Sequence, residues 1–215
     1  MANKQQKGNC YLCGASYTRS GMLKHLQTHL AAEEGQPSYL LKVRDEDNKY
    51  WLYLDLSMTS TLSALDTFLR NIWLECCGHL SAFLTGNRGY NELSMSTKLS
   101  RIPEGTELRY MYDFGSTTCL FITFVQIGQR TKQRLSVRLL ARNAPYTFPC
   151  SACGRDAAFY DMEEWPPVLY CADCMKKTGS DYPLPVTNSP RSGVCAYAGE
   201  RDSYAFDPRK VVKKT

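Results

Sequence analysis

The chain has 215 residues and a formal net charge of +5, from 26 lysines and arginines against 21 aspartates and glutamates. That length allows one sizeable hydrophobic core with small metal-binding modules beside it, but it is short for two full domains. Apolar runs all fall below the roughly 18 residues that a membrane span needs, and the N-terminal stretch MANKQQKGNC is too polar for a secretion signal. We therefore expect a soluble, cytoplasmic protein. The mildly basic charge by itself decides nothing about nucleic acid.

Cysteine usage indicates metal binding. Eight of the ten cysteines fall in adjacent or C-x-x-C pairs, and in a reducing compartment such spacing favours zinc over disulfides. Near the N-terminus, Cys10, Cys13, His25 and His29 form the pattern C-x2-C-x11-H-x3-H. The two histidines lie four residues apart on a predicted helix, so both imidazoles face one side and can complete a tetrahedron with the two thiolates. The pattern predicts a C2H2-like zinc finger.

Whether this finger reads DNA is a separate question. A standard finger reads bases from helix positions −1, 3 and 6, and counting back from His25 places Thr18, Gly21 and Lys24 there. Gly21 has no side chain to present, and one finger covers only about 3 base pairs. Arg19 and Lys24 are candidate phosphate contacts, which supply affinity without sequence. Docking of another protein is an equally good interpretation of this module.

After a boundary near Gly35 and Pro37, the hydrophobic pattern predicts an α+β body. Residues 38–45 and 49–56 alternate apolar and polar side chains, as the strands of a hairpin do. In residues 60–77 the apolar positions recur every three or four residues, which predicts one main helix with a buried face. This order predicts a mostly antiparallel sheet with the helix on one face. Further strands are expected at 79–86, 107–115, 119–128 and 134–142.

Two motifs in this body resemble a known family. The stretches CGHLSAF and YMYDFGSTTCL look like the plasmid pRiA4b ORF-3-like proteins, whose hallmark is similar to Y-x-Y-D-F-G-D-x-W-x-H. The resemblance covers about residues 38–149 and implies a fold and a plasmid or transposon setting, not a reaction. Because a finger precedes this domain and a four-cysteine module follows it, the chain looks like a distinct branch of that family. The matching residues are Tyr110, Tyr112, Asp113, Phe114, Gly115, His79, Leu80 and Phe83, whereas Ser116, Thr118 and Leu120 replace the hallmark's second acid, tryptophan and histidine.

Asp113 is a weak candidate for a catalytic residue. A carboxylate at a strand end can act as a base or hold a metal, but base catalysis needs a partner that tunes its pKa, and hydrolytic metal sites draw on several carboxylates or imidazoles. The sequence supplies no obvious second member of such a site. We expect instead a strand-ending turn in which Asp113 accepts backbone N–H bonds and Gly115 adopts a positive φ.

His79 lies close to Cys76 and Cys77, which raises the question of a third metal site. Two adjacent cysteines at a helix end are poorly placed to face one ion, so we expect His79 to be a buried, hydrogen-bonded imidazole. Cys119 and Cys195 have no partner at a metal-binding spacing, and we expect both to be core thiols.

A second zinc module is predicted near the C-terminus. Cys150, Cys153, Cys171 and Cys174 form C-x2-C-x17-C-x2-C, the spacing of a zinc ribbon. Because four thiolates leave no open coordination position, this ion would be structural, and the chain would hold two structural zinc ions. A protein-docking surface around the stretch Trp165 to Pro167 stays open as a further role of the module.

Basic residues follow one stretch with a regular period. Arg130, Lys132, Arg134, Arg138 and Arg142 all have even numbers, while the neighbouring apolar residues have odd ones. Along a strand this places the cations on one face, where they can contact a phosphate backbone. An ordinary solvated strand is an equally good interpretation.

These patterns predict a non-enzymatic zinc-binding adaptor of plasmid or mobile-element origin that contacts DNA or RNA through a basic sheet face and its zinc modules. Two alternatives stay open. One is a protein-docking adaptor without nucleic acid, and the other is a nucleic-acid-processing enzyme centred on Asp113. The predicted division of the chain is a finger at 1–36, an α+β domain at 37–149, a ribbon at 150–186, and an irregular packed segment with a basic tail at 187–215.

Overall fold

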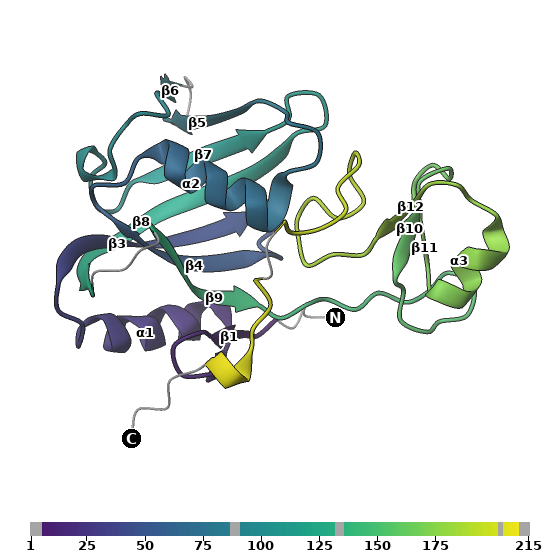
Figure 1. Ribbon diagram of the computed structural model, residues 1–215, viewed down its shortest axis with the longest axis horizontal. Helices are drawn as coiled ribbons and strands as arrows, with labels where there is room; N and C mark the ends of the chain where they lie inside the picture. The colour runs from purple at the N-terminus through teal and green to yellow at the C-terminus, as the bar shows by residue number, and fades with distance from the viewer. Residues whose placement is uncertain (1–5, 87–90, 132–135, 202–203, 211–215) are drawn as a thin grey trace.

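The computed structural model describes residues 6–86, 91–131, 136–201 and 204–210. Within these residues, the main body is a nine-stranded antiparallel sheet (Figure 1). The strands follow the spatial order β2-β1-β9-β4-β3-β8-β7-β5-β6. The predicted α+β class is confirmed. The strands are β1 (Gly8–Cys10), β2 (Ser16–Tyr17), β3 (Gln36–Asp45), β4 (Trp51–Ser57), β5 (Ser81–Thr85), β6 (Asn91–Leu93), β7 (Glu107–Tyr112), β8 (Thr118–Arg130) and β9 (Val137–Asn143).

The predicted hairpin is formed by β3 and β4, in register from Ser38 opposite Ser57 to Arg44 opposite Trp51. Strand alternation divides its side chains between the two faces of the sheet. The leucines of β4 and the odd-numbered apolar residues of β3 enter one core, while Trp51 and Tyr53 enter a second core on the opposite face. Both faces of this hairpin are therefore buried.

Helix α2 (Leu62–Leu69) covers the first of these faces and buries Leu62, Leu65 and Leu69. A wider π-helical turn, Arg70–Leu74, continues it and buries Trp73. The helix ends earlier than the predicted residue 77, because Glu75 adopts an extended conformation with ψ 116°. Two short 3₁₀ turns lie at Leu99–Arg101 and Pro208–Lys210.

The opposite face is covered by the helix of the N-terminal finger, α1 (Arg19–Leu30) (Figure 1). Its Met22 and Leu26 are fully buried in the core that also holds Trp51 and Tyr53. The finger's first strand, β1, pairs with β9 from Gly8 opposite Asn143 to Cys10 opposite Ala141. The finger is thus continuous with the main sheet in both hydrogen bonding and packing.

The C-terminal ribbon stands apart from this body in Figure 1. It consists of a three-stranded sheet, in the order β11-β10-β12, and one short helix. After the ribbon the chain returns to the body, where Ser189, Arg191 and Tyr197 are buried. Among the described residues, no helix combines the length and the apolar character that crossing a membrane requires. The ribbon elements are β10 (Phe159–Asp161), β11 (Val168–Tyr170), α3 (Ala172–Thr178) and β12 (Pro183–Pro185).

Candidate metal centres and cationic surface

The four predicted finger ligands lie together. Cys10 ends β1, Cys13 follows in a turn that Gly14 closes with φ 80°, and His25 and His29 are one turn apart on α1. The four ligand atoms lie within 4.8 Å of one another. The Nε2 atom of His25 is 3.1 Å from the Cys13 sulfur and 3.1 Å from Nε2 of His29.

These distances suit a zinc ion, whose bond lengths give tetrahedral edges of about 3.4–3.8 Å between nitrogen and sulfur ligands. The observed edges are a few tenths of an ångström shorter than the ideal. Burial raises the pKa of the Cys10 thiol to about 11. A divalent cation offsets that cost because it stabilises the thiolate directly.

The four ribbon cysteines also converge. Their sulfur atoms lie within 4.8 Å of one another, and those of Cys153 and Cys171 are 3.7 Å apart. Arg155 donates one hydrogen bond to each of these two sulfurs, both at 3.4 Å. Burial raises the pKa of the Cys150 thiol, but backbone N–H groups around it more than offset this effect and lower the pKa to about 6. The donor set and the spacing therefore fit a closed four-thiolate zinc site.

A third group consists of Cys76, Cys77, His79 and Cys195, whose ligand atoms lie within 4.8 Å of one another. Three of these residues are neighbours in the chain, and Cys195 comes from a distant segment. Cys195 is exposed and His79 retains 30% of its side-chain exposure, so the predicted core thiol and buried imidazole are wrong. Sequence spacing missed the group because Cys195 and His79 are 116 positions apart. The adjacent pair Cys76 and Cys77 was the available signal.

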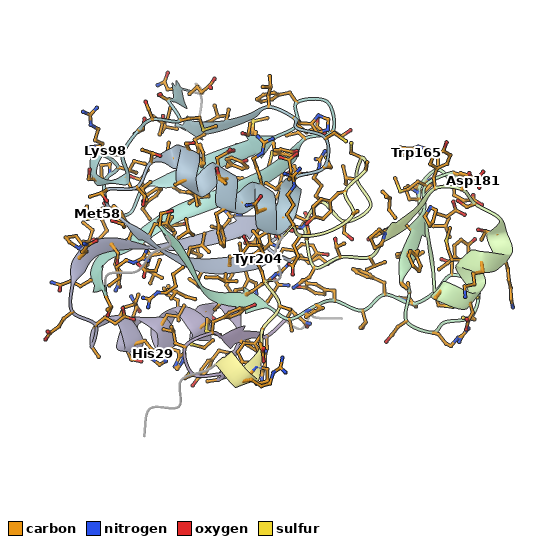
Figure 2. The ribbon with its side chains drawn as sticks, in the orientation of Figure 1. His29, Met58, Lys98, Trp165, Asp181 and Tyr204 are labelled. Carbon is orange, nitrogen blue, oxygen red and sulfur yellow. The ribbon has the colours of Figure 1, made fainter. Side chains whose placement is uncertain are left out.

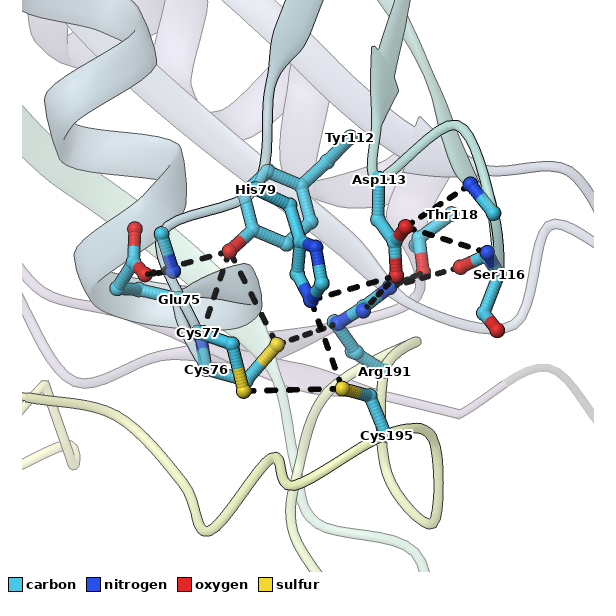
Figure 3. A network of polar contacts seen from close by, with 12 residues as sticks. Glu75, Cys76, Cys77, His79, Tyr112, Asp113, Ser116, Thr118, Arg191 and Cys195 are labelled. Atoms are coloured by element: carbon cyan, nitrogen blue, oxygen red, sulfur yellow. Dashed lines mark hydrogen bonds and ion pairs between the residues drawn. The ribbon is translucent and has the colours of Figure 1, made fainter.

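Asp113 is held in the predicted strand-ending turn (Figure 3). Its Oδ1 accepts the backbone N–H groups of Gly115 and Ser116 at 3.0 and 3.2 Å, and its Oδ2 accepts a hydrogen bond from Arg191 at 2.5 Å. The positive φ of 63° belongs to Asp113 itself, not to Gly115 as predicted, because aspartate tolerates the left-handed region. The hydrogen bond from Arg191 is the main cause that lowers the pKa of Asp113 to about 2. A general base works best with a pKa near the operating pH, so this carboxylate suits a structural role.

Arg130 and Arg138, predicted to lie on a solvated cationic face, are committed to an internal ion-pair cluster. Arg130 is only 2% exposed, and its Nε lies 3.7 Å from Oδ2 of Asp55. Arg138 contacts the same oxygen at 2.7 Å and Glu33 at 3.0 Å. The prediction of a solvated face is therefore wrong at these two positions, whereas Lys132 and Arg134 lie outside the described residues.

Arg142 lies on the other face of the sheet. A β-bulge where β9 pairs with Tyr53 and Leu54 shifts the alternation, so the adjacent residues Leu140 and Ala141 both enter the core under α1. Arg142 is buried against Glu200 at 2.6 Å and lines a cavity between the finger, β9 and the C-terminal segment. The strict even–odd pattern of the sequence does not reveal this bulge.

A different set of cations meets where α1 adjoins the open part of the sheet. We call the residues Arg19, Lys42 and Arg44 the junction cluster. Burial is the main cause that lowers the pKa of Lys42, and the neighbouring charges of Arg19 and Arg44 lower it further, whereas Glu107 raises it. Arg44 also stacks on Phe121, with its guanidinium carbon 4.2 Å from the ring centroid.

On the far side of Phe121 lies Arg109, which pairs with it across β7 and β8. Lys42, Arg44, Phe121 and Arg109 are all partly exposed. Of the two finger residues predicted to contact phosphate, Lys24 is exposed on α1, and Arg19 is partly exposed with Asn48 accepting its hydrogen bond at 2.7 Å. No periodic signal in the sequence predicts this surface, because its residues come from four separate elements.

Comparison with known proteins assigns no family: no family model matches the chain, and no curated protein matches it. Among solved structures, it is similar to a protein of unknown function, MM3350 from Methanosarcina mazei Go1, with 18% sequence identity and a TM-score of 0.43. That match covers 50% of this chain and 68% of that chain. The resemblance to the pRiA4b ORF-3-like family therefore stays a prediction.

Proposed function

We propose that this protein is a non-enzymatic, zinc-stabilised adaptor that contacts nucleic-acid phosphates through the junction cluster beside the finger helix. The observation that carries the proposal is the gathering of Arg19 and Arg44 around the partly buried Lys42, whose pKa both charges lower even though Glu107, which pairs with Arg44, raises it. An anion bound between them relieves that repulsion. Phe121 and Arg109 extend the surface with a ring and a further cation, the combination on which single-stranded bases stack.

The distribution of charge supports this assignment. The ribbon, residues 150–186, holds 3 of the 26 basic residues and 6 of the 21 acidic ones, so the rest of the chain has a formal excess of eight positive charges. A four-thiolate zinc site adds two further negative charges to the ribbon. The positive charge of the finger and the body therefore attracts nucleic-acid phosphates, whereas the negative charge of the ribbon repels them.

The ribbon favours a protein partner as a second binding role. Trp165, at the upper end of the ribbon in Figure 2, is 91% exposed. Tyr182 of the ribbon is 69% exposed. Exposed aromatic side chains are typical anchors of protein interfaces. Together, the two surfaces describe an adaptor with a nucleic-acid side and a protein side.

The test is binding of the zinc-loaded protein to mixed-sequence single-stranded and duplex DNA and RNA at several salt concentrations. The variant Lys42→Glu/Arg44→Glu reverses two charges of the junction cluster. We expect affinity to fall by about tenfold or more, and the slope of log affinity against log salt to become shallower by about 1–2, since each phosphate contact adds nearly one to it.

The matched control is Lys176→Glu/Lys177→Glu, which makes the same change of charge on α3 of the ribbon. This control should bind nearly as the unmodified protein does. Equal losses in both variants would show that net charge alone is responsible, and unchanged binding in the junction variant would remove the cluster from the function.

A further inference from the structure

The third Cys/His group is built from two distant segments. Cys76, Cys77 and His79 follow the π-helical end of α2, and Cys195 comes from the segment that returns from the ribbon (Figure 3). Because the helix ends at Leu74, the adjacent cysteines lie in a bend and not on a helix. In a helix, the side chains of two successive residues point in different directions, which keeps adjacent cysteines from facing one ion. Outside a helix this restriction does not hold, so both cysteines can face the same ion.

The distances within the group are those of a metal site. The sulfur atoms of Cys77 and Cys195 are 3.8 Å apart, and Nε2 of His79 lies 3.5 Å from the Cys195 sulfur. Tetrahedral zinc with ordinary bond lengths gives edges of about 3.8 Å between two sulfurs and about 3.5 Å between sulfur and nitrogen. The corresponding sulfur–sulfur edge in the ribbon site is 3.7 Å.

The surroundings favour a negatively charged metal centre. Arg191 is fully buried, and its Nε donates a hydrogen bond to the Cys76 sulfur at 3.4 Å. The rest of its guanidinium is fixed by the Ser116 carbonyl oxygen, the Thr118 hydroxyl and Asp113. Three thiolates and one divalent ion leave one negative charge, and the adjacent guanidinium, although it also pairs with Asp113, donates to one of these thiolates.

Backbone conformation points the same way. Gly78 has φ 72°, which lets the chain reverse between Cys77 and His79. Cys195 has φ 52°, a conformation that a cysteine adopts only when its surroundings hold it there. In this conformation its sulfur contacts both Cys77 and His79.

We propose that Cys76, Cys77, His79 and Cys195 bind a third zinc ion, which fastens the returning C-terminal segment to the end of α2. A disulfide between Cys77 and Cys195 is the competing arrangement, and it requires the sulfurs to close to about 2.05 Å. The zinc site needs no oxidant and leaves all three thiols reduced. The inference concerns metal content alone, so it stands or falls independently of nucleic-acid binding.

The test is the zinc content of the full chain, purified with a phosphine reductant and measured by inductively coupled plasma mass spectrometry. We expect three ions per chain in the unmodified protein and two in Cys195→Ser, a position whose exposure accommodates serine. The control Cys119→Ser removes a half-buried thiol outside the three groups and should retain three ions.

Limited proteolysis supplies a second readout. Cys195→Ser should expose the segment at 187–199 to cleavage, whereas Cys119→Ser should not. Two ions in the unmodified protein would overturn the proposal, as would three in Cys195→Ser. A Cys77–Cys195 disulfide in the reductant-treated protein would overturn it as well.

Discussion

Asp55 is a fully buried carboxylate on β4, in alternation with Trp51 and Tyr53, and it lies beside two arginines. With Glu33 it forms a cluster of two positive and two negative side chains, so the formal charges cancel. Burying a charge is costly unless it is paired. The two carboxylates supply these pairs, so the arginines predicted to face solvent can lie in the cluster instead. This cluster also joins the end of the finger to strands β4, β8 and β9.

We predict that Asp55→Ala lowers the free energy of unfolding by about 3–5 kcal/mol, because it removes the buried carboxylate that the buried Arg130 and the partly buried Arg138 share. Urea denaturation in the presence of zinc measures the change. Asp47→Ala is the matched control, since Asp47 is exposed in the turn between β3 and β4 and should change stability by less than about 0.5 kcal/mol. A small effect of Asp55→Ala would mean that the cluster contributes little.

Strand β1 lies so close to β9 that only glycine fits at its first position. A Cβ atom on Gly8 would overlap the carbonyl oxygen of Arg142 and the ring of Trp51. Gly128, inside β8, has open space where a Cβ atom would lie. Replacement by alanine should therefore have opposite effects on stability at the two positions.

Gly8→Ala should destabilise the protein by about 1–3 kcal/mol, because the added methyl group forces β1 away from β9. Gly128→Ala should be neutral or stabilise by up to about 1 kcal/mol, because alanine loses less conformational freedom on folding. Chemical denaturation of both variants makes the comparison. Equal effects would contradict the close approach of β1 to β9.

The sequence predicted those features whose signal is local. The hairpin of β3 and β4, the helix at α2 and the spacing of the eight predicted zinc ligands all depend on residues near one another in the chain. Prediction from the sequence failed for features that depend on contacts between distant segments. The bulge that turns Arg142 to the other face depends on pairing with β4, and the position of Cys195 beside His79 depends on the return of the chain from the ribbon.

At the scale of the whole molecule, the two predicted zinc modules are attached in different ways. The finger shares a core and a sheet with the body, whereas the ribbon has its own small sheet and stands apart from it (Figure 1). Loss of metal from the finger should therefore weaken the body, and loss from the ribbon should stay local.

Cys13→Ser and Cys153→Ser test this difference, since each replaces an exposed second cysteine of a C-x-x-C pair. We expect Cys13→Ser to lower the melting temperature of the body by about 4–8 °C, which corresponds to a loss of about 2 kcal/mol. Cys153→Ser should leave that temperature unchanged. Fluorescence of the buried Trp51 and Trp73 reports on the body, with Trp165→Phe as the common background. Equal shifts in the two variants would refute the difference in attachment.

The pairing of β1 with β9 also has a consequence for synthesis on the ribosome. Gly8 and its partner Asn143 are 135 positions apart, a distance that takes on the order of ten seconds to translate. Throughout that interval the apolar side of α1 lacks the cover that Leu140 and Ala141 of β9 supply, but all four finger ligands have already emerged by His29. We expect early zinc capture to keep the nascent finger folded until β9 arrives, so metal supply during translation should govern the yield of intact protein.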